Sequence, residues 1–272
     1  MLSLRAVGKD DTGRWGRARL LLSDRFSCSL VLIENITQLN RSESMSINPS
    51  RVWLKREIEA FSASLPKGSR VLDAGAGNQI YKSAFADHVY EAADFEKVDK
   101  EYAKSTYVCD LGEIPVPDAF FDAIVFSQVM EHLANPAYVL RELNRVSKPG
   151  ARMFFSAPLV YEEHEKPFDF FRYTQFGVRA LFEGAGFRVE RLFWLEGYMG
   201  SLNYLFKRML RHWPRNPRAL GGGAAAWILV LLLMGLTPVL KILVYLTARC
   251  DIRHRYQDTG FPLNYGAIVV KE

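Results

Sequence analysis

The chain has 272 residues, a length that suits one large domain or two small ones. Hydrophobic residues make up 49% of it and charged residues 24%, which excludes a disordered, collagen-like or low-complexity chain. Its three cysteines are widely spaced, so they exclude a disulfide framework and a paired-cysteine metal site and favour a reducing compartment.

The net charge of +5 is concentrated in one segment. Residues 201–255 carry nine lysines and arginines against one acidic residue, and the rest of the chain is slightly acidic. The basic isoelectric point is therefore a local feature, and we expect no nucleic-acid partner.

Residues 1–48 are expected to form a poorly ordered N-terminal extension. Their one short apolar patch is too short to span a membrane, and they lack the pattern of a signal peptide. Met45 is a candidate for the true translation start.

From residue 49 the pattern alternates between helices and strands. Apolar residues first recur at helical spacing between Leu54 and Leu65. The elements expected next are a strand at 70–73, a helix ending near 86, a strand at 88–94, a strand ending at 110, a strand at 121–126, a helix at 136–146, a strand at 151–157, a helix from Thr174 through Glu183 and a strand at 187–194. This alternation favours an α/β fold with a mostly parallel sheet covered on both faces.

The pattern changes after residue 200. Residues 219–240 are uncharged, and as a helix they would extend about 33 Å, enough to cross a bilayer. A strand pattern returns at 263–270 and should join the same sheet as 187–194, which excludes a single crossing. We therefore divide the chain into a core at 49–200, a basic and hydrophobic helical insert at 201–255, and a final core strand within 256–272.

The insert is expected to contact the membrane. Gly235 and Pro238 mark a place where the apolar helix would bend into a hairpin that dips into one leaflet. The alternative membrane arrangement is a helix lying in the interface, and the basic flanks favour an anionic lipid surface. An apolar dimer interface or a helical cap over the active site would also explain the apolar run.

The strand at 70–73 leads into a glycine turn at 74–78, the generic opening of a nucleotide-binding unit. A dinucleotide-binding turn has a third glycine three residues after Gly77, where this chain has Ile80, so a dinucleotide is disfavoured.

Three acids lie at neighbouring strand ends. Asp73 precedes the glycine turn, Asp94 ends the second strand and Asp110 ends the third. Carboxylates accept hydrogen bonds from ribose hydroxyls and attract cationic groups, so this trio favours a positively charged nucleoside over a phosphate-bearing one. A solvated strand end is the weaker explanation for Asp94, because the whole pattern points to a ligand-binding role.

Several segments together match a known family: 71–77, Asp94, 110–111, 121–133 and 142–150. The chain thereby resembles class I S-adenosylmethionine-dependent methyltransferases over roughly residues 50–195 and the last strand. The resemblance implies a Rossmann-like three-layer sandwich. Its seven-stranded, mostly parallel sheet would have an antiparallel last strand, with the hydrophobic helical insert placed before that strand.

The resemblance also implies S-adenosylmethionine as cofactor. No metal is expected, because the cysteines and histidines are not spaced as ligands. The residues implied to bind the cofactor are Asp73, Gly75 and Gly77 for its methionine end, Asp94 for its ribose, Asp110 and Leu111 for its adenine, and Gln128 at the end of the fourth strand.

The segment 164–174 is similar to a loop signature of a bacterial methyltransferase subgroup, with a histidine followed by Pro-x-Asp-aromatic-aromatic-Arg-Tyr-Thr. Members of that subgroup often resemble enzymes that act on surface polysaccharides or lipid-linked glycans.

His132 and His164 are the candidate general bases, since a hydroxyl nucleophile benefits from a base with a pKa near neutrality. Each has a simpler interpretation: a helix-start hydrogen bond for His132 and a loop-ordering one for His164. Glu131 is expected to be structural.

Arg172 and Tyr173 are candidate substrate-binding residues. Arg172 would clamp an anionic substrate, or would instead pair with Asp169 and order the loop. Tyr173 would otherwise be a packing residue.

We therefore expect a methyltransferase that acts on a hydroxyl of a sugar or lipid-linked glycan at the cytoplasmic face of the membrane. Methylation of a hydrophobic small molecule such as a quinone precursor is one alternative. A non-catalytic S-adenosylmethionine-binding membrane adaptor is the other. The sequence leaves the acceptor and the oligomeric state open.

Overall fold

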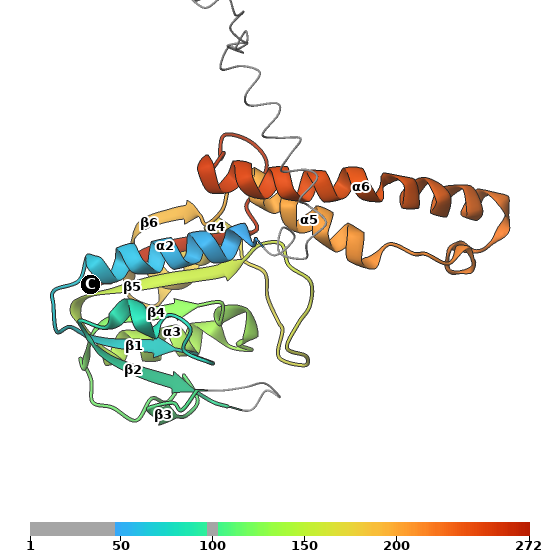
Figure 1. Cartoon of the computed structure of the whole chain (residues 1–272). Coiled ribbons are helices and arrows are strands. Elements are labelled where there is room, and N and C mark those ends of the chain that lie inside the picture. The colour runs from blue at the N-terminus through green and yellow to red at the C-terminus, as the bar shows by residue number, and fades with distance from the viewer. Residues whose placement is uncertain (1–46, 97–102) are drawn as a thin grey trace, which may run out of the picture. The chain divides into compact units, whose positions relative to one another are not determined.

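The computed structural model describes residues 47–96 and 103–272 (Figure 1). The expected N-terminal extension, with Met45, lies outside the described residues apart from Ile47 and Asn48. The elements, in chain order, are α2 Pro49–Ala63, β1 Arg70–Ala74, the 3-10 helix η2 Lys82–Phe85, β2 Val89–Asp94, β3 Tyr107–Val108, β4 Phe121–Ser127, η3 Met130–His132, α3 Pro136–Val146, β5 Ser147–Pro158, α4 Gln175–Gly184, β6 Phe187–Trp194, α5 Tyr198–His212, η4 Pro217–Leu220, α6 Gly223–Arg253 and β7 Asn264–Lys271.

The described strands form one seven-stranded sheet in the order β3-β2-β1-β4-β5-β7-β6. The pairs among β1 to β5 are parallel, whereas β7 runs antiparallel to both β5 and β6. The predicted fold class is therefore confirmed: a three-layer α/β sandwich with an antiparallel last strand and the helical insert before it. The parallel pairing brings the carboxyl ends of β1, β2 and β4 to one edge of the sheet.

Each face of the sheet is covered by helices with an apolar side. Helix α2 packs Leu54, Ile58 and Phe61 on one face, and α3 and α4 cover the other. Side chains cap two of these helices: Asn135 accepts from the amide of Tyr138 in α3, and Thr174 accepts from that of Gly177 in α4.

The prediction of a helix that ends near residue 86 is wrong. Only the short 3-10 helix η2 forms there, and turns connect it to the glycine turn. Gln79 has a positive φ of 54°, which an α-helix does not tolerate, and its buried side chain donates a hydrogen bond to the carbonyl of Lys104.

The expected bend at Gly235 and Pro238 is also wrong, because α6 runs through both residues as one helix of 31 residues. The chain turns back at Gly221–Gly223 instead, where all three glycines have positive φ between 74° and 87°. Helices α5 and α6 therefore lie side by side and extend together from the sheet (Figure 1). We call residues 198–253 the α5–α6 hairpin.

Buried polar contacts attach the base of this hairpin to the core. The Asp251 carboxylate accepts from the indole of Trp53 in α2 and from the amide of Gly200 in α5, both at 2.9 Å. Asn203 of α5 donates to the carbonyl of Val244 in α6 at 2.5 Å. The hairpin is therefore anchored at its base by partners that α2, α5 and α6 share.

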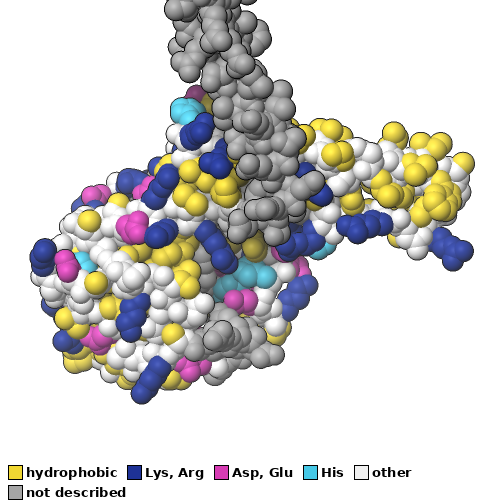
Figure 2. All heavy atoms as spheres, viewed as in Figure 1, with side chains coloured by type: hydrophobic (Ala, Val, Ile, Leu, Met, Phe, Trp, Pro, Cys, Tyr) yellow, Lys and Arg dark blue, Asp and Glu magenta, His cyan; other side chains and the backbone are white. Residues whose placement is uncertain are grey.

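The free end of the hairpin is apolar and exposed. Helix α6 has a mean hydropathy of 2.4 over its most apolar window, yet only 17% of that window is buried. By length and composition it is the one helix among the described residues that could cross a membrane. Figure 2 shows hydrophobic side chains gathered on the hairpin. The exposed large ones on α6 are Trp227, Ile228, Leu229, Leu231, Leu232, Met234, Leu236 and Val239.

Candidate active site

The glycine turn after β1 has a backbone conformation that residue types other than glycine would disturb. Gly75 has φ +77°, and a Cβ there would lie 2.4 Å from a methyl group of Val129. The Gly77 amide donates to the Asp94 carboxylate at 2.9 Å, which ties the turn to the end of β2. The turn therefore presents bare backbone beside a carboxylate, as a close-fitting ligand requires.

The two buried acids of this edge have different surroundings. Asp94 also accepts from the amide of Glu96 and is 4% exposed. Asp73 accepts a hydrogen bond from the Tyr90 hydroxyl at 2.5 Å, and its burial raises its pKa to about 6. Asp73 is thus poised to change charge just below neutral pH.

A cavity of about 520 Å³ opens at these strand ends. It brings together six of the predicted site residues: Gly75, Asp94, Asp110, Leu111, Gln128 and His132. The amide of Gly112 donates to Asp110, which orients that carboxylate at 2.8 Å. Asp73 lines neither this cavity nor the next, and its side chain is buried.

A second cavity of about 500 Å³ adjoins the first, and the two share Gly75, Gln128 and Glu165. It contains the predicted Gly77 and His164, and helix α5 forms its far wall. The polar residues that α5 contributes are Asn203, Tyr204, Lys207, Arg208 and Arg211. A continuous space therefore runs from the glycine turn to the basic side of the hairpin.

The two histidine rings meet between these cavities. Their centroids are 4.6 Å apart, with the rings at 74° to one another. Nδ1 of His132 lies 2.5 Å from the carbonyl oxygen of Phe168, to which it donates, so Nε2 carries the lone pair. Burial lowers the pKa of His132 and favours this neutral form.

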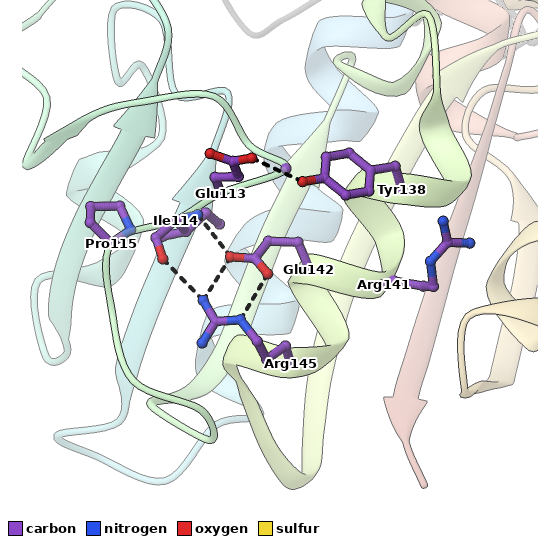
Figure 3. A pocket seen from close by; sticks show the side chains of 8 residues that line it. Glu113, Ile114, Pro115, Tyr138, Arg141, Glu142 and Arg145 are labelled. Carbon is purple, nitrogen blue, oxygen red and sulfur yellow. Dashed lines mark hydrogen bonds and ion pairs between the residues drawn. The ribbon is translucent and has the colours of Figure 1, made fainter.

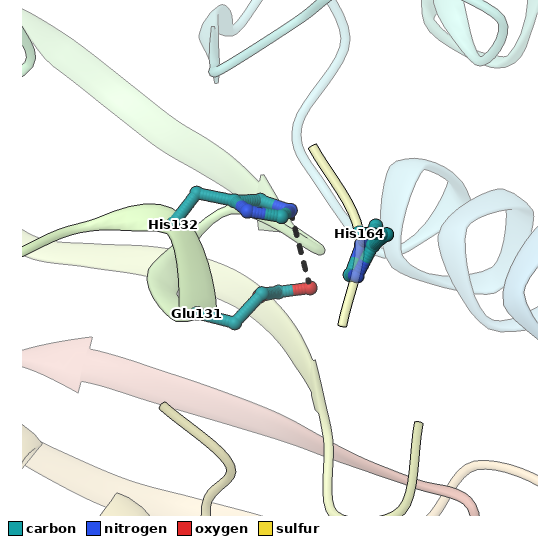
Figure 4. Close-up of side chains that lie close together, drawn as sticks. All are labelled: Glu131, His132 and His164. Carbon is teal, nitrogen blue, oxygen red and sulfur yellow. Dashed lines mark ion pairs between the residues drawn. The ribbon is translucent and has the colours of Figure 1, made fainter. Parts of the chain in front are cut away.

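Glu131 lies beside these rings, with Oε1 4.0 Å from Nε2 of His132 (Figure 4). Its side chain is fully buried, and neither carboxylate oxygen has a hydrogen-bond partner among the described residues. Burial raises its pKa to about 8. Nothing in the sequence around Glu131 indicates that this side chain is buried without a partner, since a Glu-His pair at a helix start has ordinary structural uses.

Arg172 takes the loop-ordering role that the sequence left open. Its guanidinium grips both oxygens of Asp169, at 2.6 and 2.8 Å, and holds the pKa of that carboxyl well below its usual range. Tyr173 is buried and donates to the carbonyl of Met130. Neither residue lines the two cavities, and their contact with a substrate stays a prediction.

The basic residues of α5 were missed as site residues. The available signal was the charge excess of residues 201–255, which indicates a basic surface without saying what it faces. Only the packing of α5 beside the glycine turn makes them part of the site.

A separate hollow lies beside α3 and contains none of the predicted site residues (Figure 3). Its charged groups pair with one another: Arg145 binds Glu142 at 2.7 Å, and Tyr138 donates to Glu113 at 3.2 Å. These contacts hold the loop after β3 against α3, a structural task.

Comparisons with known proteins agree with a cofactor site at the carboxyl ends of β1, β2 and β4, which we call the cofactor edge. A family model described as a methyltransferase domain matches residues 50–192, more than half of the chain. The ubiquinone/menaquinone biosynthesis C-methyltransferase UbiE of Burkholderia multivorans is 25% identical over 148 residues, which are 48% of this chain. The match spans only 60% of that relative's length.

Solved structures with a similar fold include two bacterial enzymes. An S-adenosylmethionine-dependent methyltransferase from Aquifex aeolicus is 24% identical, with a TM-score of 0.40 over 58% of this chain and 90% of its own. One from Mesorhizobium loti is 13% identical, with a TM-score of 0.43 over 78% of this chain and 96% of its own.

Proposed function

We propose that the chain, which belongs to the methyltransferase domain family, is a class I S-adenosylmethionine-dependent enzyme that methylates a hydroxyl of an anionic, membrane-associated acceptor. A sugar carried on a lipid phosphate fits this description. The proposal concerns the acceptor, the methylated atom and the place of action.

The cofactor edge fits the group that the family uses. Gly75 and Gly77 leave room for the methionine end, and Asp94 offers carboxylate oxygens to the ribose at the rim of the first cavity. Asp110 and Leu111 line the same cavity and would contact the adenine. When bound, S-adenosylmethionine supplies an electrophilic methyl group on a sulfonium.

The observation that carries the proposal is the second cavity. Its near wall is the glycine turn and its far wall is α5, with Lys207, Arg208 and Arg211. Cationic side chains on the acceptor side attract an anionic group such as a phosphate. Arg208 pairs with Glu162, so an acceptor phosphate would compete with that carboxylate.

The residues between the cavities would handle the proton. In hydroxyl methylation an oxygen–carbon bond forms, the sulfur–carbon bond breaks and the hydroxyl loses its proton. Nε2 of His132 is free to accept a proton and the ring of His164 lies beside that of His132, so we expect one of the two histidines to take the proton. Holding the acceptor in line would supply much of the remaining rate enhancement.

The hairpin would bring the enzyme to its acceptor. Its exposed apolar end would enter the interface of an anionic membrane at the cytoplasmic face, with the basic residues of α5 near the headgroups. Since its base is anchored to the core, the second cavity would open close to the lipid surface. The acceptor would then reach the site without leaving the membrane.

A second candidate is methylation of a hydrophobic ring such as a quinone precursor. The names of the relatives favour it, because they are C-methyltransferases of ubiquinone and menaquinone biosynthesis. The cationic wall of the second cavity favours the anionic acceptor instead.

The test is to incubate the purified chain with radiolabelled S-adenosylmethionine and extracted envelope lipids. We expect S-adenosylhomocysteine release and label in a lipid-linked glycan fraction, on an oxygen by fragmentation mass spectrometry. Label confined to the neutral quinone fraction would replace this proposal with the second candidate. Label in a water-soluble acceptor alone would contradict both.

A further inference from the structure

Glu131 differs from the other buried acids of the described residues. Asp73, Asp94, Glu196 and Asp251 each accept at least one hydrogen bond. Glu131 is as deeply buried, yet neither of its oxygens has such a partner. Buried carboxyl oxygens without a partner are costly, so a cation or a hydrogen-bond donor at this place would stabilise the site.

Each of the two neighbouring histidines has one ring nitrogen beside a hydrogen-bond acceptor, which leaves the other nitrogen available to bind an ion. His132 uses Nδ1 on the carbonyl of Phe168, which leaves Nε2 as an acceptor. Nδ1 of His164 lies 3.3 Å from the carbonyl of Glu162 and 3.3 Å from the Asp169 carboxylate. An acceptor that holds one ring nitrogen and fixes the ring is the usual support of a metal-binding histidine.

One ligand atom from each of Glu131, His132 and His164 lies within 4.8 Å of the other two (Figure 4). We propose that these three residues bind a divalent transition-metal ion. Two imidazoles and one carboxylate suit Zn²⁺, Fe²⁺, Mn²⁺ or Co²⁺ and leave a coordination position open. Ligand bonds of about 2.1 Å would draw the three side chains about 1 Å closer together.

The place of this cluster points to its use. His132 lines the first cavity and His164 the second, so the open coordination position faces the space where the two cavities adjoin. This role rests on the proposed function, because it concerns the acceptor hydroxyl. The ion would bind that oxygen and lower its pKa, so that the proton leaves to solvent while the oxygen takes the methyl group from sulfur. The histidines then act through the ion instead of taking the proton themselves.

The test is a titration of the tag-free, chelator-treated protein with Co²⁺ alone, followed by visible absorption and by metal analysis after gel filtration. We expect one Co²⁺ per chain, d–d bands of a low-coordinate site, and displacement by Zn²⁺. Glu131→Gln and His164→Gln should each weaken Co²⁺ binding at least tenfold. His254→Gln, at an exposed histidine outside the cluster, should bind as the wild type does.

Glu131→Gln keeps the shape of the side chain without its ionisable group, so this variant should fold, which circular dichroism checks. Absence of stoichiometric Co²⁺, Zn²⁺ or Mn²⁺ binding by the wild type would overturn the inference. Wild-type Co²⁺ affinity in both Glu131→Gln and His164→Gln would also overturn it.

Calorimetry with S-adenosylmethionine separates this failure from a failure of the proposed function. A wild-type chain that binds the cofactor but no metal contradicts only the metal site. A chain that binds metal but not the cofactor contradicts the proposed function.

Discussion

The carboxyl of Asp73 links a buried position to the chemistry of the ligand. Its pKa of about 6 results first from burial, which opposes the charged form, while the Tyr90 hydrogen bond acts in the other direction. The resemblance to the family assigns Asp73 to the methionine end of the cofactor, which carries an ammonium group. An ammonium needs the ionised carboxylate, so binding and ionisation should be linked.

Affinity for S-adenosylmethionine should therefore fall as the pH is lowered. With a pKa of about 6, the ionised fraction of Asp73 falls from about one half at pH 6 to about one tenth at pH 5, so the association constant should fall about fivefold over this range. Calorimetry across this range measures the slope.

Two variants complete that experiment. Asp73→Asn should bind weakly and without this slope. Asp118→Asn, at a carboxylate that is 80% exposed, should retain it. A flat wild-type profile would contradict the assignment of Asp73.

At the scale of elements, the sequence predicted that the α5–α6 hairpin exists but not where it turns. Apolar length and flanking charge predicted a returning helical insert, because the strands on either side had to share one sheet. The position of the bend was wrong: Pro238 suggested a break, whereas the three glycines at 221–223 make the turn. A proline is tolerated within a long helix that has ample hydrogen bonds on both sides.

The anchoring of the hairpin could not be read from the sequence. Asp251 and Trp53 are 198 positions apart, and nothing local indicates that they bond. Their contact depends on the completed sheet, which brings α2 and α6 together.

Asp251→Ala should lower the free energy of unfolding by about 2 kcal/mol, because it leaves the Trp53 indole and the Gly200 amide without their acceptor. Urea denaturation followed by tryptophan fluorescence measures this loss. Asp258→Ala, at an exposed position, is the control and should change stability by less than about 0.5 kcal/mol. Equal stability of the two variants would contradict the anchoring role.

The apolar end of the hairpin should bind lipid. The double variant Leu231→Ser and Leu232→Ser removes two side chains that are 60% and 66% exposed, so it should reduce flotation with vesicles containing anionic lipid at least tenfold. Phe176→Ser removes an apolar residue that is 75% exposed on α4, away from the hairpin, and should float like the wild type. Unchanged flotation of the double variant would exclude this surface as the membrane contact.

At the scale of the whole molecule, the two halves of the site differ in how far they follow from sequence. The cofactor half is built from the ends of consecutive parallel strands, so local patterns suffice to place Asp94, Asp110 and Gln128 at one edge. The half that we propose for the acceptor joins the glycine turn, the loop after β5 and helix α5, which come together only in the folded chain. The sequence therefore predicts the residues expected to bind the methyl donor, but not the α5 wall of the second cavity, which would face the acceptor.

The central claim is that Asp94 holds the ribose of S-adenosylmethionine, and calorimetry of the cofactor with wild-type and variant chains tests it most directly. Asp94→Asn should weaken binding about tenfold, and Asp94→Ala about a hundredfold, since charged hydrogen bonds to the ribose are lost and the Gly77 amide loses its acceptor. Asp118→Ala should bind as the wild type does. Wild-type affinity in Asp94→Ala would contradict the account.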